Sequence, residues 1–280
     1  MIENSKFIKK LEGVIRQIET SQFMFDRQRN GLLNTLKSLE SDAKKIGEDS
    51  IELGKINFHI GFLLSNKMFD KEESRDRISF ALRINEKNTF LTQKEILAAT
   101  ELLTGLYIEL GLHEDAIKCL EKIQGIAKDG SFDSDIRLGV LSQSGFYYHE
   151  LGMYNEALKL NLSILEEAEE IYGPLDSKLI NVTRNISENY YCLNKIEDST
   201  RYQNKVIALA QHNNNSEIEV ESLFKLGVLN YESGNIKKSK EYLLKSLDVA
   251  NNSGDESLIS FAKSNLDELA NKTKKWWKVW

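Results

Sequence analysis

Proline is almost missing from this sequence, because its 280 residues contain only one, Pro174. A chain so poor in the residue that interrupts helices is compatible with an almost entirely helical fold. Cysteine is nearly as scarce, and the two that occur, Cys119 and Cys192, form no CxxC pair. We expect two buried free thiols rather than a disulfide or a structural zinc site.

Long apolar runs are also missing. No stretch approaches the roughly 20 apolar residues that a membrane-spanning helix needs, so the sequence predicts no membrane span. The first residues, MIENSKFIKKLEG, have no apolar secretion signal, which makes a cytoplasmic location the expectation. The net charge of −6 argues against nucleic acid as a partner, since nucleic acid attracts basic surfaces.

The sequence also lacks motifs that are typical of catalytic or cofactor-binding sites. No GxxxxGK[ST] phosphate loop and no GxSxG nucleophile turn occurs. No two histidines have the i, i+4 spacing of a metal site; the four are His59, His113, His149 and His212. We therefore expect no catalytic residues, no metal and no cofactor, and a protein that is not an enzyme.

What the sequence does have is a period. Four residues suited to a left-handed backbone recur at intervals of 41, 42 and 40 residues: Gly111, Gly152, Asn194 and Gly234. A small residue follows each of them in the next predicted helix: Ala116, Ala157, Ser199 and Ser239. The turn residues end the first helix of each hairpin. The small residues let the second helix approach the first closely. This pattern predicts a solenoid of helical hairpins that pack on one another.

The repeated pattern resembles the tetratricopeptide repeat over roughly residues 95–250. The segment YGPLDSKLINVTRNISENYYCLNKIEDSTRYQNKVIAL is most similar to the longer repeat of kinesin light chain. The resemblance implies an all-α, right-handed α-superhelix (solenoid) of tetratricopeptide-like hairpins with a concave groove. About seven residues beyond the ordinary 34-residue unit lengthen its helices by about 10 Å, which predicts a deeper groove. More loosely, the chain resembles Rap-type bacterial peptide-sensing regulators, which place a helical bundle before long repeats.

Three segments are expected along the chain. Residues 1–50 form an N-terminal helical segment, residues 51–250 form the repeats (a degenerate unit at 51–90 and four units at 95–250), and residues 251–280 form a capping helix and a Trp/Lys-rich tail. We expect the tryptophans of this tail to pack on the capping helix or to contact a partner.

Apolar residues recur at sevens in the N-terminal segment: Leu11, Ile18, Phe25, Leu32, Leu39 and Ile46. They predict either a hairpin packed on the first repeat, which we favour, or the seam of a homodimer. Asn30-Gly31 is the expected helix stop. Because Gln22 and Arg29 interrupt the companion heptad position, we expect a monomer.

The resemblance further implies that the first helix of each hairpin lines the concave groove. Eleven residues are predicted to bind a peptide or partner there: Gln143, Phe146, His149, Asn181, Arg184, Asn185, Glu188, Tyr191, Phe224, Lys225 and Tyr231. Amides and guanidinium groups suit a peptide backbone, and aromatic rings provide apolar pockets. We expect the contacts to centre on Arg184, Asn185 and Lys225. A clamp for a terminal carboxylate is disfavoured, because Phe146 and Glu188 stand where such clamps have asparagine.

The function implied is that of a non-enzymatic adaptor or scaffold that binds a protein or peptide in its groove. Two alternatives stay open at this point. One is a peptide-responsive regulator of the Rap type that switches its binding to a target protein, and the other is a structural or assembly protein that oligomerises through its ends.

Overall fold

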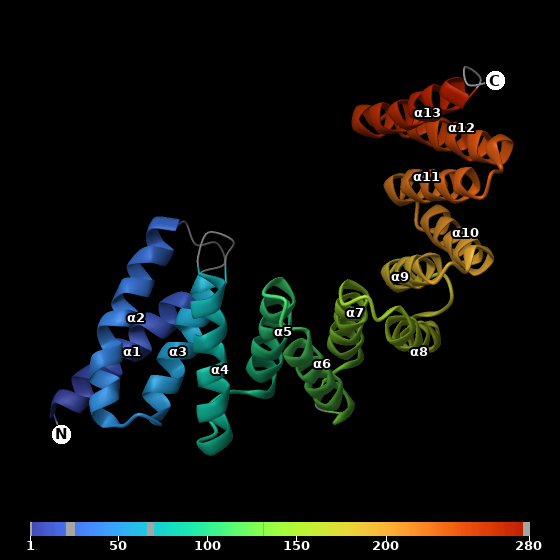
Figure 1. The fold of residues 1–280 in the computed structure, drawn as a ribbon. Coiled ribbons are helices and arrows are strands. Elements are labelled where there is room, and N and C mark those ends of the chain that lie inside the picture. The colour runs from blue at the N-terminus through green and yellow to red at the C-terminus, as the bar shows by residue number, and fades with distance from the viewer. Residues whose placement is uncertain (1, 21–25, 66–69, 131, 277–280) are drawn as a thin grey trace. The chain divides into compact units, whose positions relative to one another are not determined.

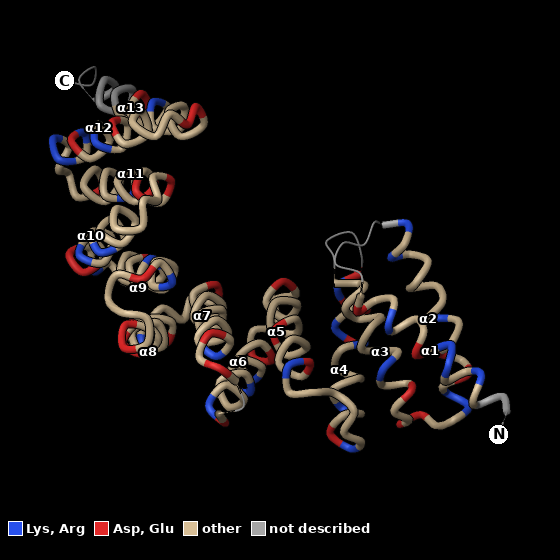
Figure 2. The backbone as a smooth tube through the Cα atoms, turned by 180° about the vertical axis from the view of Figure 1, so that it is seen from behind, with Lys and Arg blue, Asp and Glu red and all other residues tan. Residues whose placement is uncertain are grey.

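The structure, a computed structural model, describes residues 2–20, 26–65, 70–130 and 132–276. These residues form thirteen α-helices and no strand, so the predicted all-α solenoid of hairpins is confirmed. The chain divides into two compact units, residues 1–133 and residues 134–280, and each is described by itself. In both, basic and acidic residues are interspersed along the helices (Figure 2).

Unit 1 contains six helices, which run in chain order from the N-terminus (Figure 1). They are α1 (Ile2–Thr20), α2 (Asp26–Ile46), α3 (Ile51–Leu64), α4 (Lys71–Lys87), α5 (Gln93–Glu109) and α6 (His113–Lys128). Helices α3 and α4 pack as a hairpin, and so do α5 and α6. Asp70 and Thr92 cap α4 and α5 through side-chain bonds to free backbone N–H groups.

Unit 2 contains three successive hairpins and a final helix (Figure 1). They are α7 (Ser134–Glu150) with α8 (Tyr154–Tyr172), α9 (Leu179–Cys192) with α10 (Ile196–His212), α11 (Ser216–Glu232) with α12 (Ile236–Ser253), and α13 (Glu256–Trp276). Helix α13 packs on α12 and α11. No described helix has the length and apolar character needed to cross a membrane.

The predicted turn residues have the backbone conformation that the period requires. Gly111, Gly152 and Gly234 have φ of +72°, +72° and +78°, and Asn194 has φ of +58°. At each turn the following N–H reaches back to the helix that has just ended, as Met153 N does to the Tyr148 carbonyl oxygen at 2.9 Å. This left-handed cap satisfies carbonyls that the helix end would leave free.

The small residues of the period are buried, as predicted. Ala116 and Ala157 are 0% exposed, and Ser199 and Ser239 are 1% exposed. Such burial allows the two helices of a hairpin to approach each other closely.

The N-terminal heptad residues pack inside unit 1. Leu11, Leu32, Leu36 and Leu39 form one core with Ile56 and other apolar residues of α3. These side chains pack against α3 of the same chain, which is the arrangement that we favoured over a homodimer seam. Phe25 and Gln22 lie outside the described residues.

The helix stop expected at Asn30-Gly31 is wrong, because α2 begins at Asp26 and continues through both residues. A glycine inside a helix costs roughly 1 kcal/mol relative to alanine. Leu32, Leu33 and Leu36, which follow immediately, are at most 7% exposed. Burial of a leucine stabilises by roughly 1.5–3 kcal/mol, so packing outweighs the local preference of Gly31.

Candidate functional site

Helices α7, α9 and α11, the first helices of the three hairpins in unit 2, are linked by contacts between side chains. His149 of α7 shares a 2.7 Å hydrogen bond with Asn189 of α9. The Tyr191 hydroxyl of α9 donates to a carboxylate oxygen of Glu232 on α11 at 2.9 Å. Two pockets lined by these three helices, one of them also by α10, form the candidate site.

One pocket, here called the His149 pocket, has a volume of about 230 Å³. It is lined by Gly145, Phe146, His149, Glu150, Arg184, Asn185, Glu188, Asn189 and Lys225. All of these residues come from α7, α9 and α11. Phe146 is 44% exposed, which leaves an aromatic surface at this place for a ligand.

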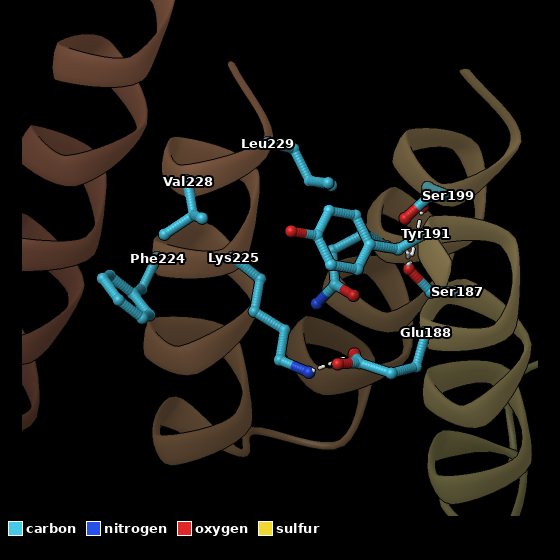
Figure 3. Close-up of a pocket in the computed structure, with 9 residues that line it drawn as sticks. Ser187, Glu188, Tyr191, Ser199, Phe224, Lys225, Val228 and Leu229 are labelled. Atoms are coloured by element: carbon cyan, nitrogen blue, oxygen red, sulfur yellow. Dashed lines mark hydrogen bonds and ion pairs between the residues drawn. The ribbon is translucent and has the colours of Figure 1, made fainter. Parts of the chain in front are cut away.

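A second pocket, here called the Tyr191 pocket, has a volume of about 200 Å³. It is lined by Ser187, Glu188, Tyr191, Ser199, Gln203, Phe224, Lys225, Val228 and Leu229. In Figure 3 the Tyr191 ring extends from α9 toward α11, while Phe224 and Val228 project from α11. Glu188 and Lys225 line both pockets, so the two are neighbours on one surface, here called the groove.

The cations of the groove already have acidic partners. Lys225 Nζ lies 2.5 Å from Glu188 Oε2, and Arg184 Nη2 lies 3.2 Å from Glu221 Oε2. Each pair joins α9 to α11, and its side chains are between 31% and 44% exposed. Such pairs contribute at most about 1 kcal/mol, so a ligand can rearrange them at modest cost. The groove therefore presents balanced charges rather than a basic patch.

Two buried amides that line the pockets have unused hydrogen-bond donors. Asn189, which lines the His149 pocket, is 0% exposed, and Gln203, which lines the Tyr191 pocket, is 1% exposed. Within the described part of the chain, neither Asn189 Nδ2 nor Gln203 Nε2 has a hydrogen-bond partner. A buried donor without a partner costs roughly 1–3 kcal/mol, which a ligand acceptor would recover.

Asn189 and Gln203 were missed by sequence reasoning, although the sequence carries a signal for them. Each stands in phase with the apolar residues of its helix, Asn189 after Val182 and Ile186, and Gln203 between Ser199 and Val206. An amide is unusual at a position in helical phase with the buried apolar residues, because burial of a polar group is unfavourable without a hydrogen-bond partner.

Eight of the eleven predicted residues line the two pockets: Phe146, His149, Arg184, Asn185, Glu188, Tyr191, Phe224 and Lys225. The other three line neither of them. Gln143 and Asn181 are exposed on their helices, and Tyr231 is half-buried. The assignment of any of these residues to a ligand stays a prediction.

Reactive groups in and beside the groove are held in their neutral forms. The bond to Glu232, with a smaller effect of burial, raises the pKa of Tyr191. Partial desolvation by neighbouring residues raises the pKa of Cys192 at the end of α9, so its thiol is protonated near neutral pH and weakly nucleophilic. Both cysteines are free; Cys119 is half-buried, and the burial predicted for Cys192 is wrong, because its side chain is exposed in the last turn of α9.

Comparison with known families and structures identifies the repeats. Residues 137–212 and 220–253 each match a family model described as the tetratricopeptide repeat. These segments are tetratricopeptide repeats. The resemblance drawn from the sequence is thereby confirmed, and the groove lies within the matched tetratricopeptide residues. Among curated proteins, none matches the chain by sequence.

Solved structures with a similar fold include repeats of a putative kinesin light chain from Podosopora anserina, with a TM-score of 0.59 and 15% identity over 76% of this chain and 99% of that chain. The apo form of RapI has a TM-score of 0.58 and 16% identity over 96% and 99% of the two chains. Aspartyl phosphate phosphatase F from Bacillus subtilis has a TM-score of 0.60 and 16% identity over 91% of this chain and 63% of that chain. At these identities the likeness concerns the fold.

Proposed function

We propose that the tetratricopeptide repeats of unit 2 bind an extended segment of a partner protein along α7, α9 and α11. The observation that carries this proposal is the pair of buried, unpartnered amide donors, Asn189 Nδ2 and Gln203 Nε2, each in a pocket of the same groove. An extended peptide presents backbone carbonyl oxygens at regular intervals, and these are the acceptors that such amides need.

The size and lining of the pockets support a peptide rather than a larger compact ligand. Volumes of about 200 and 230 Å³ are below the range of roughly 300–1,000 Å³ that is typical of drug-sized ligands. Each is suited to one side chain of a bound segment. Phe224, Val228 and Leu229 make the Tyr191 pocket suitable for an apolar side chain.

Tetratricopeptide repeats are generally binding scaffolds, and we place this protein with them as a non-enzymatic adaptor. The proposal includes a cytoplasmic setting, in which the free thiols of Cys119 and Cys192 stay reduced. Assembly through the N-terminal heptads has less support, because Leu11, Leu32 and Leu39 are already buried within unit 1.

A second candidate function is that of a peptide-responsive regulator of the Rap type. The observation that favours it is the extent of the fold likeness to RapI, which covers 96% of this chain and 99% of that chain. A regulator of this kind needs two packings of the repeats and a ligand that binds one of them better. X-ray scattering with and without a bound peptide separates the two functions, since a switch changes the radius of gyration and a passive adaptor does not.

A peptide-display selection on the full chain tests the principal proposal. Random peptides are selected on the wild-type protein, and the best binder is mapped by hydrogen exchange. We expect slower exchange in α7, α9 and α11 of the complex, and in α10 near Gln203, with α8 and α12 less affected. A binder that protects only α8 or α12, or a selection that enriches no peptide, would contradict the proposal.

A further inference from the structure

A separate cavity of unit 1 lies between α1, α3 and the start of α5, none of which lines the groove. Its volume is about 410 Å³. One wall is a face of α1 that carries Glu12, Arg16 and Glu19, spaced by four and three residues. The facing wall belongs to α3 and carries Lys55 and His59, four residues apart.

The polar character of these two faces explains why a cavity remains between them. Helices usually pack by fitting apolar ridges into grooves. The apolar face of α1, with Leu11 and Val14, is used in the core with α2 and α3. The neighbouring face that reaches the cavity carries charges, and charged side chains do not fill a core.

The charges at this cavity are not neutralised by the chain. Elsewhere in unit 1, ion pairs join different helices: Lys37–Glu73 at 3.0 Å and Arg77–Glu40 at 2.9 Å. By contrast, in the described part of the chain the side chains of Glu12, Arg16, Glu19 and Lys55 make no hydrogen bond and no ion pair within 4.0 Å; at Arg16 only the backbone carbonyl oxygen is engaged, by the Thr20 hydroxyl. A third carboxylate of the lining, Glu95, is engaged by Thr92 in the capping box of α5. Two cations and two carboxylates on α1 and α3 therefore remain available to a ligand.

His59 supplies a second, independent sign of a ligand site. The residue is 8% exposed and lines the cavity, yet neither ring nitrogen has a hydrogen bond to any residue that the structure describes. Burial lowers the pKa of His59 to about 4, so the ring is neutral near pH 7 and offers one donor and one acceptor. An imidazole that is nearly buried and has no protein partner can hydrogen-bond to a ligand in the cavity.

Apolar walls complete the site. Phe58 of α3, which is 7% exposed, and Phe90, which is half-buried before α5, line the same cavity. Aromatic rings favour an apolar ligand body. The cavity thus combines carboxylates, cations, a neutral imidazole and aromatic rings.

We propose that this cavity binds a small zwitterion with an apolar body, the chemistry of a free apolar amino acid or of an apolar dipeptide. The ligand carboxylate lies between Arg16 and Lys55, and its ammonium group faces Glu12 and Glu19. A ligand of one sign would leave the charges of the other sign without a partner, whereas a zwitterion compensates both sets. The cavity volume falls in the usual range of roughly 300–1,000 Å³ for small-molecule sites.

Calorimetric titration of the full chain tests this proposal with four probes: L-phenylalanine, the Phe-Phe dipeptide, N-acetyl-phenylalanine and phenylalanine amide. We expect L-phenylalanine, the Phe-Phe dipeptide or both to bind. Their relative affinities show whether the site prefers a free amino acid or a dipeptide. Blocking either end removes one charge, so N-acetyl-phenylalanine and phenylalanine amide should each bind roughly tenfold or more weakly than L-phenylalanine.

Variants locate the site. Lys55→Met and Glu12→Gln should each weaken zwitterion binding by roughly tenfold or more, whereas Lys10→Met, at an exposed position of α1 that does not line the cavity, should leave it unchanged. Glu12 is exposed, so its substitution keeps the test valid if Lys55→Met fails to fold. The proposal is overturned if neither zwitterion binds at about 10 mM, if the blocked forms bind equally well, or if Glu12→Gln has no effect.

Discussion

The ammonium of Lys225 on α11 lies 2.5 Å from a carboxylate oxygen of Glu188 on α9, and both side chains line the His149 and Tyr191 pockets. A ligand that enters either pocket therefore meets a cation that already has a partner. This arrangement argues against a simple receptor for a terminal carboxylate, in which the lysine would have to be available. It favours a ligand held by hydrogen bonds to amides and by apolar contacts.

The Lys225–Glu188 pair should contribute little to stability. Its side chains are 39% and 41% exposed, and exposed pairs typically contribute about 0.2–1 kcal/mol. A double-mutant cycle with Lys225→Met and Glu188→Gln, measured by urea unfolding, should therefore give a coupling free energy below about 1 kcal/mol. A coupling of about 3 kcal/mol or more would mean that the pair is far better shielded from solvent than the structure shows.

Gly145 should be intolerant of a side chain. A methyl group built on it would collide with the amide of Asn161 on α8, which is 0% exposed. We expect Gly145→Ala to lower the free energy of unfolding by about 1–3 kcal/mol, the usual range for overpacking.

Gly139 of the same helix is the matched control, because a methyl group there meets nothing within 4 Å and the residue is exposed. Gly139→Ala should raise the free energy of unfolding by up to about 1 kcal/mol through helix propensity alone. Equal effects of the two substitutions in thermal denaturation would be inconsistent with close contact between α7 and α8 at Gly145.

His59 should make unit 1 sensitive to acid. Burial, followed by nearby Lys55, lowers its pKa while Glu95 raises it, with a net result of about 4 against 6.5 in the unfolded chain. The unfolded chain takes up the proton first, so stability is fully present above pH 6.5 and is lost progressively between pH 6.5 and 4. A shift of this size corresponds to about 3 kcal/mol.

The melting temperature measured across this range checks the effect. In the His59→Gln variant the melting temperature should fall less between pH 6.5 and 4 than in the wild type. The His113→Gln variant, changed at an exposed position of α6, should show the same fall as the wild type. If both variants lose stability in acid as steeply as the wild type, groups other than His59 control the transition.

The protein should be a monomer at micromolar concentration. The heptad residues Leu32, Leu36 and Leu39 are at most 7% exposed within unit 1, so little of the seam is left for a second chain. Sedimentation equilibrium on the full chain measures this directly. Leu36→Asp should destabilise unit 1 without changing the mass, whereas a wild-type dimer that the same substitution dissociates would show that the heptads serve association.

The sequence was sufficient for the features that depend on local chemistry. Gly152 and Asn194 marked left-handed turns because few residues adopt that backbone, and Ala157 and Ser199 marked close helix contacts because small side chains permit them. The choice of the first helix of each hairpin as the groove helix came from the resemblance to the tetratricopeptide repeat. At Gly31 the same local reasoning failed, since burial of the neighbouring leucines outweighed the preference of one glycine.

The details of the sites depended on contacts that sequence spacing does not contain. Lys225 and Glu188 lie 37 residues apart in sequence, and their pairing follows from how α9 and α11 pack. Gln203 was missed because its role depends on a pocket that residues of α9 and α11 complete. The cavity beside His59 likewise results from the way α1 meets α3, which a single sequence does not specify.

The affinity of one selected peptide for two matched variants tests the central claim most directly. Phe146 lines the His149 pocket and Ile171 lies on α8 outside both pockets, and each side chain is 44% exposed, so Phe146→Glu and Ile171→Glu place the same charge at equally exposed positions. Measured by fluorescence polarisation on the full chain, Phe146→Glu should weaken binding roughly tenfold or more and Ile171→Glu less than about twofold. Equal loss in both variants, or loss only in Ile171→Glu, would contradict binding in the groove of α7, α9 and α11.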